Sequence, residues 1–188
     1  ELAEFLYTPD LNHFVGDVRI SDITEEYDPD KEYPSVVDRF FTRYYNVRDD
    51  KKDEDHLVLM HSNRICLIGL APGHAAFGKG IALITYDIGN YDRSKNKVSG
   101  KAKRGGMQLQ PCTALAVVKC QDGTEYKVVS CITGRLVEVN PRIVENPSMI
   151  TSEGEGYVAI VLPRIDKVEA IKASLLTEEQ YKKIDNPQ

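Results

Sequence analysis

Short strand-like stretches separated by turn signals fill the middle of the chain, and they constrain its fold more than any other feature. The stretches are HLVLMHS (56–62), RICLIGLA (64–71), IALITYDI (81–88), TALAVVKC (113–120), EYKVVSCI (125–132), RLVEVN (135–140) and YVAIVLP (157–163). Asp122-Gly123 lies between two of them and is the clearest hairpin signal. Many short strands with little helix between them predict a small, mainly β barrel or sandwich.

A helix is predicted on each side of these strands. In PSVVDRFFTRYY (34–45) apolar pairs recur every four residues, and Ser35 with Asp38 resembles a capping box. This helix either offers an aromatic face to a partner or packs on its own domain, and packing is favoured because an exposed apolar stripe is a liability. Near the other end, Thr177 and Gln180 predict a capped helix over EEQYKKI.

Charge is divided unevenly along the chain. Residues 1–34 carry a formal charge of −8 within a total of −5, which leaves +3 for residues 35–188. Because residues 1–34 lack clustered apolar side chains, they are predicted to form an acidic extension. Residues 35–188 are predicted to form one domain with its core at about 56–163.

A basic strip is the most conspicuous polar feature of that domain. Its cations are Lys95, Lys97, Lys101, Lys103 and Arg104, and residues 94–106 contain no acid. The strip is either a solvated loop, a surface for phosphate backbones or acidic proteins, or a contact for the chain's own acidic extension. It contains no aromatic side chain to stack on a base, which disfavours recognition of single-stranded nucleic acid.

The segment Gly73–Gly80 reads G-x-x-x-x-G-K-G and narrowly misses a phosphate-binding loop. Gly80 stands where a Ser or Thr hydroxyl would ligate Mg²⁺, and the next stretch is strand-like rather than helical. The segment is therefore predicted to be a glycine-rich bend between strands.

Cysteine spacing gives no zinc signature, because Cys66, Cys112, Cys120 and Cys131 lie 46, 8 and 11 residues apart. Cys66 and Cys120 fall in apolar stretches and are predicted to be buried thiols. His56 and His61 are predicted to lie on opposite faces of a strand. No metal or cofactor is expected. The sequence has no N-x-[ST] sequon free of proline, which favours a reducing compartment, the cytosol or the nucleus.

Neither a membrane partner nor secretion is expected. The chain contains no apolar run approaching the ~20 residues of a membrane span. Its N-terminal residues ELAEFLYTPDLNHF show no signal-peptide pattern.

The order of the segments resembles two related groups of proteins. The positions matching the glycine-cleavage H-protein are Gly69, Gly78, Gly134, Val137, Asn140, Pro147, Gly154, Glu155 and Gly156. Longer blocks over roughly residues 35–185, including DHLVLMHSNRICLIGLA and DGTEYKVVSCITGRLVEVN, look like the Abitram family of actin-binding transcription modulators. The resemblance implies a barrel-sandwich hybrid, the H-protein-like hammerhead, with an N-terminal and a C-terminal helix.

An H-protein carries a lipoylated lysine at a hairpin tip, and this chain has Gly123 at the matching position. Lys119 and Lys127 lie on the hairpin arms instead. The resemblance therefore implies a carrier scaffold that is not lipoylated.

Resemblance to the Abitram family also implies a non-enzymatic protein. Such a protein would bind actin filaments and monomers, modulate actin assembly and act on transcription, in nuclear speckles, cytoplasm and actin-rich projections. The basic strip is the candidate contact, because actin surfaces are acidic. The alternatives are a degenerate carrier or enzyme, a nucleic-acid-binding factor, and an adapter subunit.

Overall fold

The computed structural model describes residues 14–15, 18–19, 28–48, 50–101 and 103–185. The chain divides into two compact units, residues 1–33 and 34–188. In the first unit, β1 (Phe14–Val15) pairs antiparallel with β2 (Val18–Arg19). The rest of the predicted acidic extension up to residue 27 lies outside the described residues.

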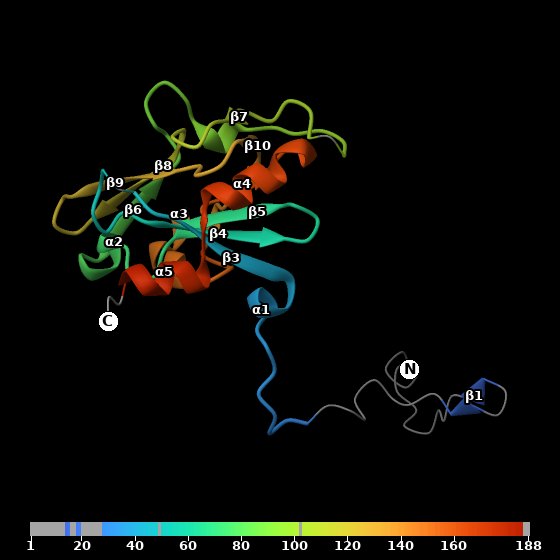
Figure 1. Ribbon diagram of the computed structural model, residues 1–188. Coiled ribbons are helices and arrows are strands. Elements are labelled where there is room, and N and C mark those ends of the chain that lie inside the picture. Colours follow the sequence, from blue (N-terminus) through green and yellow to red (C-terminus); the bar gives the residue numbers. More distant parts are fainter. Residues whose placement is uncertain (1–13, 16–17, 20–27, 49, 102, 186–188) are drawn as a thin grey trace, which may run out of the picture. The chain divides into compact units, whose positions relative to one another are not determined.

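The second unit is built on two antiparallel sheets that do not close into a barrel (Figure 1). The larger sheet has the order β12-β3-β4-β5-β11-β10-β7, and the smaller one has the order β6-β8-β9. The strands of the larger sheet are β3 (Phe41–Asn46), β4 (His56–His61), β5 (Cys66–Leu70), β7 (Gln108–Leu109), β10 (Gly134–Val139), β11 (Ala159–Leu162) and β12 (Leu176–Thr177). Those of the smaller sheet are β6 (Ile81–Thr85), β8 (Ala114–Cys120) and β9 (Glu125–Val129). The mainly β prediction is confirmed.

The main core lies between these sheets and takes side chains from both. Its largest fully buried members include Ile68, Ile84, Leu115 and Leu136. In β5 buried and half-buried positions alternate, because alternate side chains of a strand point to the core. Among the cysteines, Cys66, Cys120 and Cys131 are buried and Cys112 is exposed, which confirms the prediction for the first two.

The predicted helix over 34–45 is wrong beyond its first turn. The helix α1 (Val36–Phe40) gives way to β3, which pairs with β4 along its whole length. The reason is that residues four apart share a face in a strand as well as in a helix, so the repeat suits both structures. Tertiary pairing of aromatic and β-branched residues then favours the strand. The capping box of Ser35 and Asp38 is confirmed.

A second apolar cluster attaches the ends of this unit to the outer part of the large sheet. Its buried members are Val37, Tyr45, Leu57, Leu59, Ala71 and Tyr181. The rings of Tyr45 and Tyr181 stack with centroids 4.0 Å apart. Helix α5 (Glu178–Asp185) supplies Tyr181 and begins with the predicted Thr177–Gln180 capping pair. Helix α1 therefore packs on its own domain through Val37, whereas its Phe40 remains exposed.

Short helices fill the connections. They are α2 (Ala75–Gly78), η1 (Arg93–Lys95), α3 (Arg142–Glu145), η2 (Pro147–Thr151), η3 (Ile165–Lys167) and α4 (Val168–Ser174). The bend predicted at Gly73–Gly80 thus contains one helical turn before β6, which pairs antiparallel with β8. Among the described helices, none has the length and apolar character to cross a membrane.

Two histidines are buried in the interior. His56 is fully buried in β4, and its Nε2 accepts a hydrogen bond from the Val129 N–H at 3.1 Å. His74 caps α2 by accepting from the Ala76 N–H, and its ring centroid lies 6.1 Å from that of His56. His61 is partly exposed at the other end of β4. Because β4 pairs without a register shift and the two histidines are five residues apart, they lie on opposite faces of the strand, as predicted.

Acid is expected to destabilise the protein through His56. Burial, reinforced by His74, lowers the pKa of His56 to about 3, whereas the pKa is about 6.5 in an unfolded chain. The unfolded state therefore binds the extra proton first, and stability falls as the pH drops from about 6.5 toward 3, by about 2 kcal/mol at pH 5 from this residue alone. Denaturant unfolding between pH 7 and 5 measures this loss.

His56→Gln is expected to reduce that pH dependence while keeping an acceptor for the Val129 N–H. His61→Gln is the matched control, since it removes a histidine at the partly exposed end of the same strand. A His56→Gln protein that loses stability with acid as steeply as the unmodified protein would contradict the assignment.

Candidate functional site

The hairpin tip of the smaller sheet is where a lipoyl carrier presents its lysine. Gly123 occupies the tip with φ +82°, a left-handed conformation that a lysine would adopt only with strain. The adjoining residues are tethered, because the Lys79 ammonium lies 3.4 Å from the Asp122 carboxylate and donates to the Thr124 hydroxyl at 3.1 Å. On the hairpin arm, Lys119 is paired with Glu125 at 2.7 Å. The tip itself therefore has a glycine where a carrier has its lysine, and Lys127 on the other arm is exposed.

The basic strip and the residue before it are hydrogen-bonded to strands of both sheets, β8 of the smaller and β10 of the larger. The buried Arg93 donates to the Ala114 carbonyl, and the Asn96 amide donates to the carbonyls of Leu136 and Val137. Farther along, the backbones of Ser99 and Arg104 exchange two hydrogen bonds of 2.9 Å, which closes a tight turn. Hydrogen bonds of its described residues thus hold the strip against the fold.

The five predicted strip residues are not equivalent in the structure. Lys95, Lys97, Lys101 and Arg104 are exposed, and Lys103 is half-buried. Lys95 also lies 3.4 Å from Asp92, the acid just before the strip. Lys101 differs from the others because it lines a pocket.

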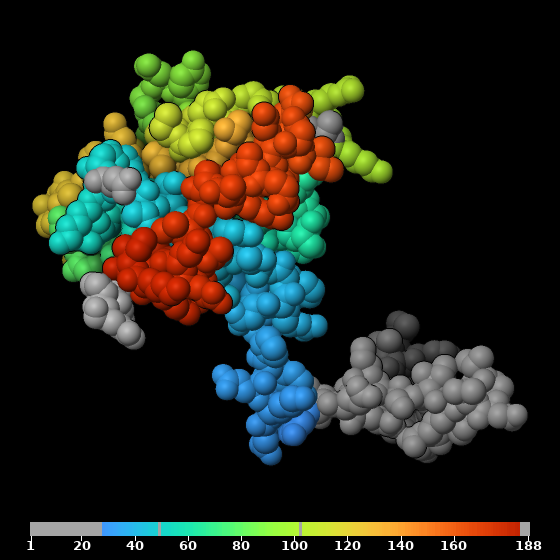
Figure 2. Space-filling model, viewed as in Figure 1, coloured from blue at the N-terminus to red at the C-terminus, as the bar shows by residue number. Residues whose placement is uncertain are grey.

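That pocket, which we call the cationic pocket, has a volume of about 440 Å³. Its lining residues are Arg64, Lys101, Gln108, Thr133, Gly134, Arg135, Leu162, Pro163, Arg164 and Lys167. They come from the β4–β5 turn, the strip, β7, β10 and the segment after β11. In Figure 2 the yellow-green side chains near residue 100 project beside the orange segment that follows β11. The fold thus gathers basic residues from distant parts of the sequence around Lys101.

Sequence reasoning missed Arg64, Arg135, Arg164 and Lys167. None of them belongs to a local charge cluster comparable to the strip. Arg64 has one local signal, since it follows Ser62-Asn63 in a turn, where its φ is +67°. The others become neighbours only through the pairing of β10 with β11 and of β11 with β5.

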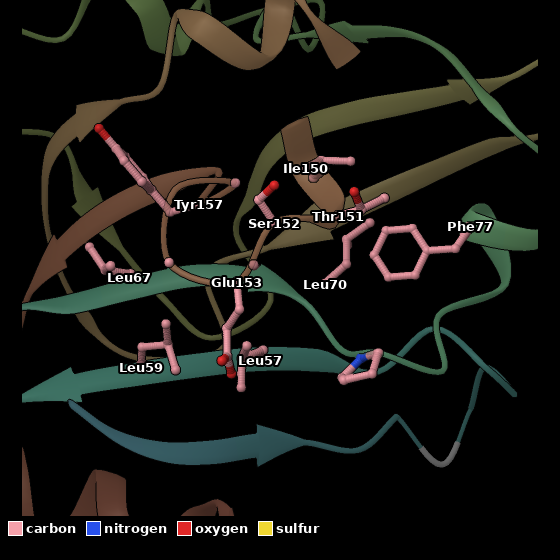
Figure 3. A pocket seen from close by; sticks show the side chains of 14 residues that line it. Leu57, Leu59, Leu67, Leu70, Phe77, Ile150, Thr151, Ser152, Glu153 and Tyr157 are labelled. Atoms are coloured by element: carbon pink, nitrogen blue, oxygen red, sulfur yellow. The ribbon is translucent and has the colours of Figure 1, made fainter. Parts of the chain in front are cut away.

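An apolar pocket of about 310 Å³ lies on a different part of the larger sheet. Figure 3 shows Leu57 and Leu59 of β4 and Leu67 of β5 across from the segment that carries Ile150 and Tyr157. This pocket offers apolar side-chain contacts, and its chemistry differs from that of the cationic pocket.

Glu153 extends into the apolar pocket toward β4 (Figure 3). Its carboxylate accepts two hydrogen bonds from Arg43 on β3, at 2.6 and 2.7 Å. Arg43 also lies 2.7 Å from Asp38 of α1, and these acids hold the pKa of the Arg43 guanidinium above its usual value. These ion pairs link β3 to α1 and to the segment after η2.

The described residues contain no group of three or more His, Cys, Asp or Glu side chains placed to hold a metal ion.

Two further candidate chemistries also lack support. Burial raises the pKa of the Cys66 thiol to about 12, so this thiol remains protonated at neutral pH. The Gly73–Gly80 bend carries the buried His74 at the start of α2 and leads into a strand, which does not suit a phosphate-binding loop.

Comparison with solved structures identifies the fold. A glycine cleavage system H protein from Mycobacterium marinum superposes with a TM-score of 0.51 over 77% of this chain and 96% of that chain, at 16% sequence identity. The H-protein-like barrel-sandwich hybrid is therefore confirmed as the fold.

Comparison of sequences identifies the family, although no family model matches the chain. A protein named Abitram from Drosophila melanogaster is 56% identical over 164 residues, covering 86% of this chain and 74% of that protein. Homo sapiens Abitram is 46% identical and covers 80% of this chain and 87% of its own length. Dictyostelium discoideum Abitram is 34% identical and covers 81% and 89%. The chain, with its H-protein-like scaffold and a glycine at the carrier position, belongs to the Abitram family.

Proposed function

We propose that this protein is a non-enzymatic interaction protein that binds actin monomers and filaments through its basic strip. Membership of the Abitram family supports the proposal, because the family resemblance carries the expectation of actin binding. The single structural observation that carries the choice of surface is the exposure of Lys95, Lys97, Lys101 and Arg104 on one segment of the chain. Such a surface complements acidic patches on a partner.

A non-enzymatic role fits the chemistry of the scaffold. The hairpin tip has a glycine in a left-handed conformation instead of a carrier lysine, and Lys79 is tied to its neighbours. The buried Cys66 and Cys131 have raised pKa values because burial disfavours the thiolate. These observations argue against a swinging-arm carrier at the hairpin tip and against a thiolate nucleophile at Cys66 or Cys131.

Action on transcription and on actin assembly, in the nucleus and the cytoplasm, belongs to the same proposal and rests on the family alone. A second candidate is a nucleic-acid-binding or adapter subunit that uses the same strip. Its motivation is the basic surface itself, and steep loss of binding with added salt distinguishes contacts to phosphate backbones from a filament contact with an apolar component.

Reversal of the strip's charge is expected to abolish co-sedimentation with actin filaments. The variant is Lys95→Glu/Lys97→Glu/Arg104→Glu, which changes exposed side chains and leaves Lys101 in the cationic pocket intact. Like-charge repulsion against an acidic filament surface is the physical reason for the loss. Sedimentation of the full chain over a range of filament concentrations measures it.

The matched control is Lys52→Glu/Lys127→Glu/Lys183→Glu, which makes the same charge change at exposed lysines outside the strip. It is expected to keep most of the binding. Equal losses of binding in both variants would show that the loss depends on net charge and not on the strip. Unchanged binding of the strip variant would show that the strip is not part of the actin interface.

A further inference from the structure

The cationic pocket has the composition of an anion site. Three arginines and two lysines line it, and among the described lining residues none is acidic or aromatic. Arginine supplies a planar fork of N–H donors that fits phosphate oxygens, and lysine supplies a compact charge. Five cations that share one concave surface repel one another, so a multivalent anion relieves the repulsion on binding.

Two arginines of this pocket contact backbone carbonyls of neighbouring segments. One terminal nitrogen of Arg64 donates to the Pro163 carbonyl at 2.9 Å, which positions the guanidinium across the gap between the β4–β5 turn and the end of β11. On β10, Arg135 approaches the Lys103 carbonyl at 3.5 Å. A guanidinium held by a 2.9 Å hydrogen bond, as that of Arg64 is, loses less conformational entropy when an anion binds.

Arg164 has an acidic neighbour. Asp166 lies 3.0 Å from Arg164 at the exposed rim. For Arg64, Lys101 and Lys167, the described part of the chain supplies no salt bridge. These cations therefore remain available to a ligand, unlike Lys119 and Lys79, which are paired on the hairpin.

The neutral part of the lining narrows the chemical class of the ligand. Gln108 offers an amide, and Thr133 offers a hydroxyl oxygen that donates to Gln110 and can accept from a ligand hydroxyl. Leu162 and Pro163 form the apolar part. No aromatic ring is present among the lining residues to stack on a nucleobase. A volume of about 440 Å³ falls in the range of small-molecule sites.

We propose that the cationic pocket binds a phosphorylated polyol, a compact ring or chain that carries several phosphate esters and free hydroxyl groups. The arginines and lysines contact the phosphates, while Gln108 and Thr133 contact the hydroxyls. The ligand is either a soluble polyol phosphate or the same chemical group displayed as a lipid headgroup. This site goes beyond the proposed actin contact and does not depend on it.

Calorimetric titration of the full chain with inositol trisphosphate tests the proposal, with ATP as a comparator that carries the same number of phosphates on a nucleoside. Binding of inositol trisphosphate is expected to be the tighter of the two. Lys101→Glu/Lys167→Glu is expected to weaken it at least about tenfold, since two charge-assisted contacts become repulsive.

The control variant Lys95→Glu/Lys97→Glu makes the same change of net charge at strip positions that do not line the pocket. It is expected to change affinity about twofold or less at physiological salt, where distant charges are screened. The thermal midpoint of each variant verifies folding. Arg64→Lys tests whether the planar guanidinium matters. The variant keeps the positive charge but loses the paired N–H donors, so we expect it to bind inositol trisphosphate more weakly.

A second arm separates the two sources of the ligand. Vesicles of phosphatidylcholine containing a phosphoinositide are compared with vesicles containing phosphatidylserine. Binding to the first kind alone, lost in Lys101→Glu/Lys167→Glu, supports the pocket with a lipid headgroup as ligand, whereas binding of free inositol trisphosphate supports a soluble one. Equal affinity for ATP, equal loss in the two charge variants, or no binding in either arm would overturn the proposal.

Discussion

Replacement of Gly156 by alanine is expected to unfold this protein or to lower its stability by more than about 3 kcal/mol. A Cβ atom on Gly156 would collide with backbone on several sides: the Met149 carbonyl oxygen, the Ser152 carbonyl oxygen at 2.6 Å and the Ile150 carbonyl carbon at 2.8 Å. Backbone atoms cannot rotate away as a side chain does, so the whole turn would have to move. Urea unfolding of the purified variant measures the loss.

The collision also threatens the turn's own hydrogen bond, since the Gly156 N–H donates to the Ser152 carbonyl at 2.7 Å. Gly69→Ala is the matched control. Gly69 lies in β5, and nothing stands within 4 Å of a Cβ placed there. We expect it to change stability by less than about 1 kcal/mol. A Gly156→Ala protein with the unfolding midpoint of the unmodified chain would refute the steric argument.

Replacement of Asn140 by alanine is expected to lower stability by about 2–4 kcal/mol. Asn140 is 1% exposed, and its side-chain NH₂ group donates to the carbonyls of Glu155 and Tyr157, each at 2.9 Å. Its side-chain oxygen accepts from the Arg142 N–H at 3.1 Å. Alanine would leave these backbone groups without their partner, and removing one side of a buried hydrogen bond is more damaging than removing both.

Asn140→Asp sharpens this second test, because the carboxylate keeps an acceptor for Arg142 but loses both donors. We expect it to be at least as destabilising as alanine at neutral pH, where a buried charge would face two carbonyl oxygens. Asn90→Ala at an exposed turn is the control, with an expected change within about 0.5 kcal/mol. Equal stability of the Asn140 and Asn90 variants would show that this network does not hold the loop.

Strand patterns and turn chemistry were sufficient to predict most of the sheet. The hairpin around Asp122-Gly123 forms because alternating apolar residues and a glycine with positive φ specify it locally. The stretch 34–45 was not decided locally, since its four-residue repeat fits a helix and a strand alike. The short strands β7 and β12 have two residues each and depend on their neighbours, so no local pattern could reveal them.

In the candidate sites, too, some features follow from the local sequence and others depend on long-range contacts. The strip was visible because its cations lie close together in the sequence, and the structure places Lys101 of the strip in the cationic pocket. Arg64 and Arg164 are 100 positions apart and meet at the pocket only because β5 and β11 pair. The apolar pocket depends likewise on the return of the segment after η2 over β5, a long-range contact that apolar periodicity does not encode.

At the outer edge of the large sheet, β3 from the start of the unit pairs with β12 from near its end, and this pairing has a consequence for biosynthesis. Strand β3 is among the first parts of its unit to be made, yet its outer neighbour is β12, and Tyr45 stacks on Tyr181. During translation the outer edge of β3 therefore stays open until the chain has been extended through Tyr181. An open strand edge is a site for pairing with other chains. We therefore expect the outer edge of β3 to be the last part of the large sheet to be covered during synthesis.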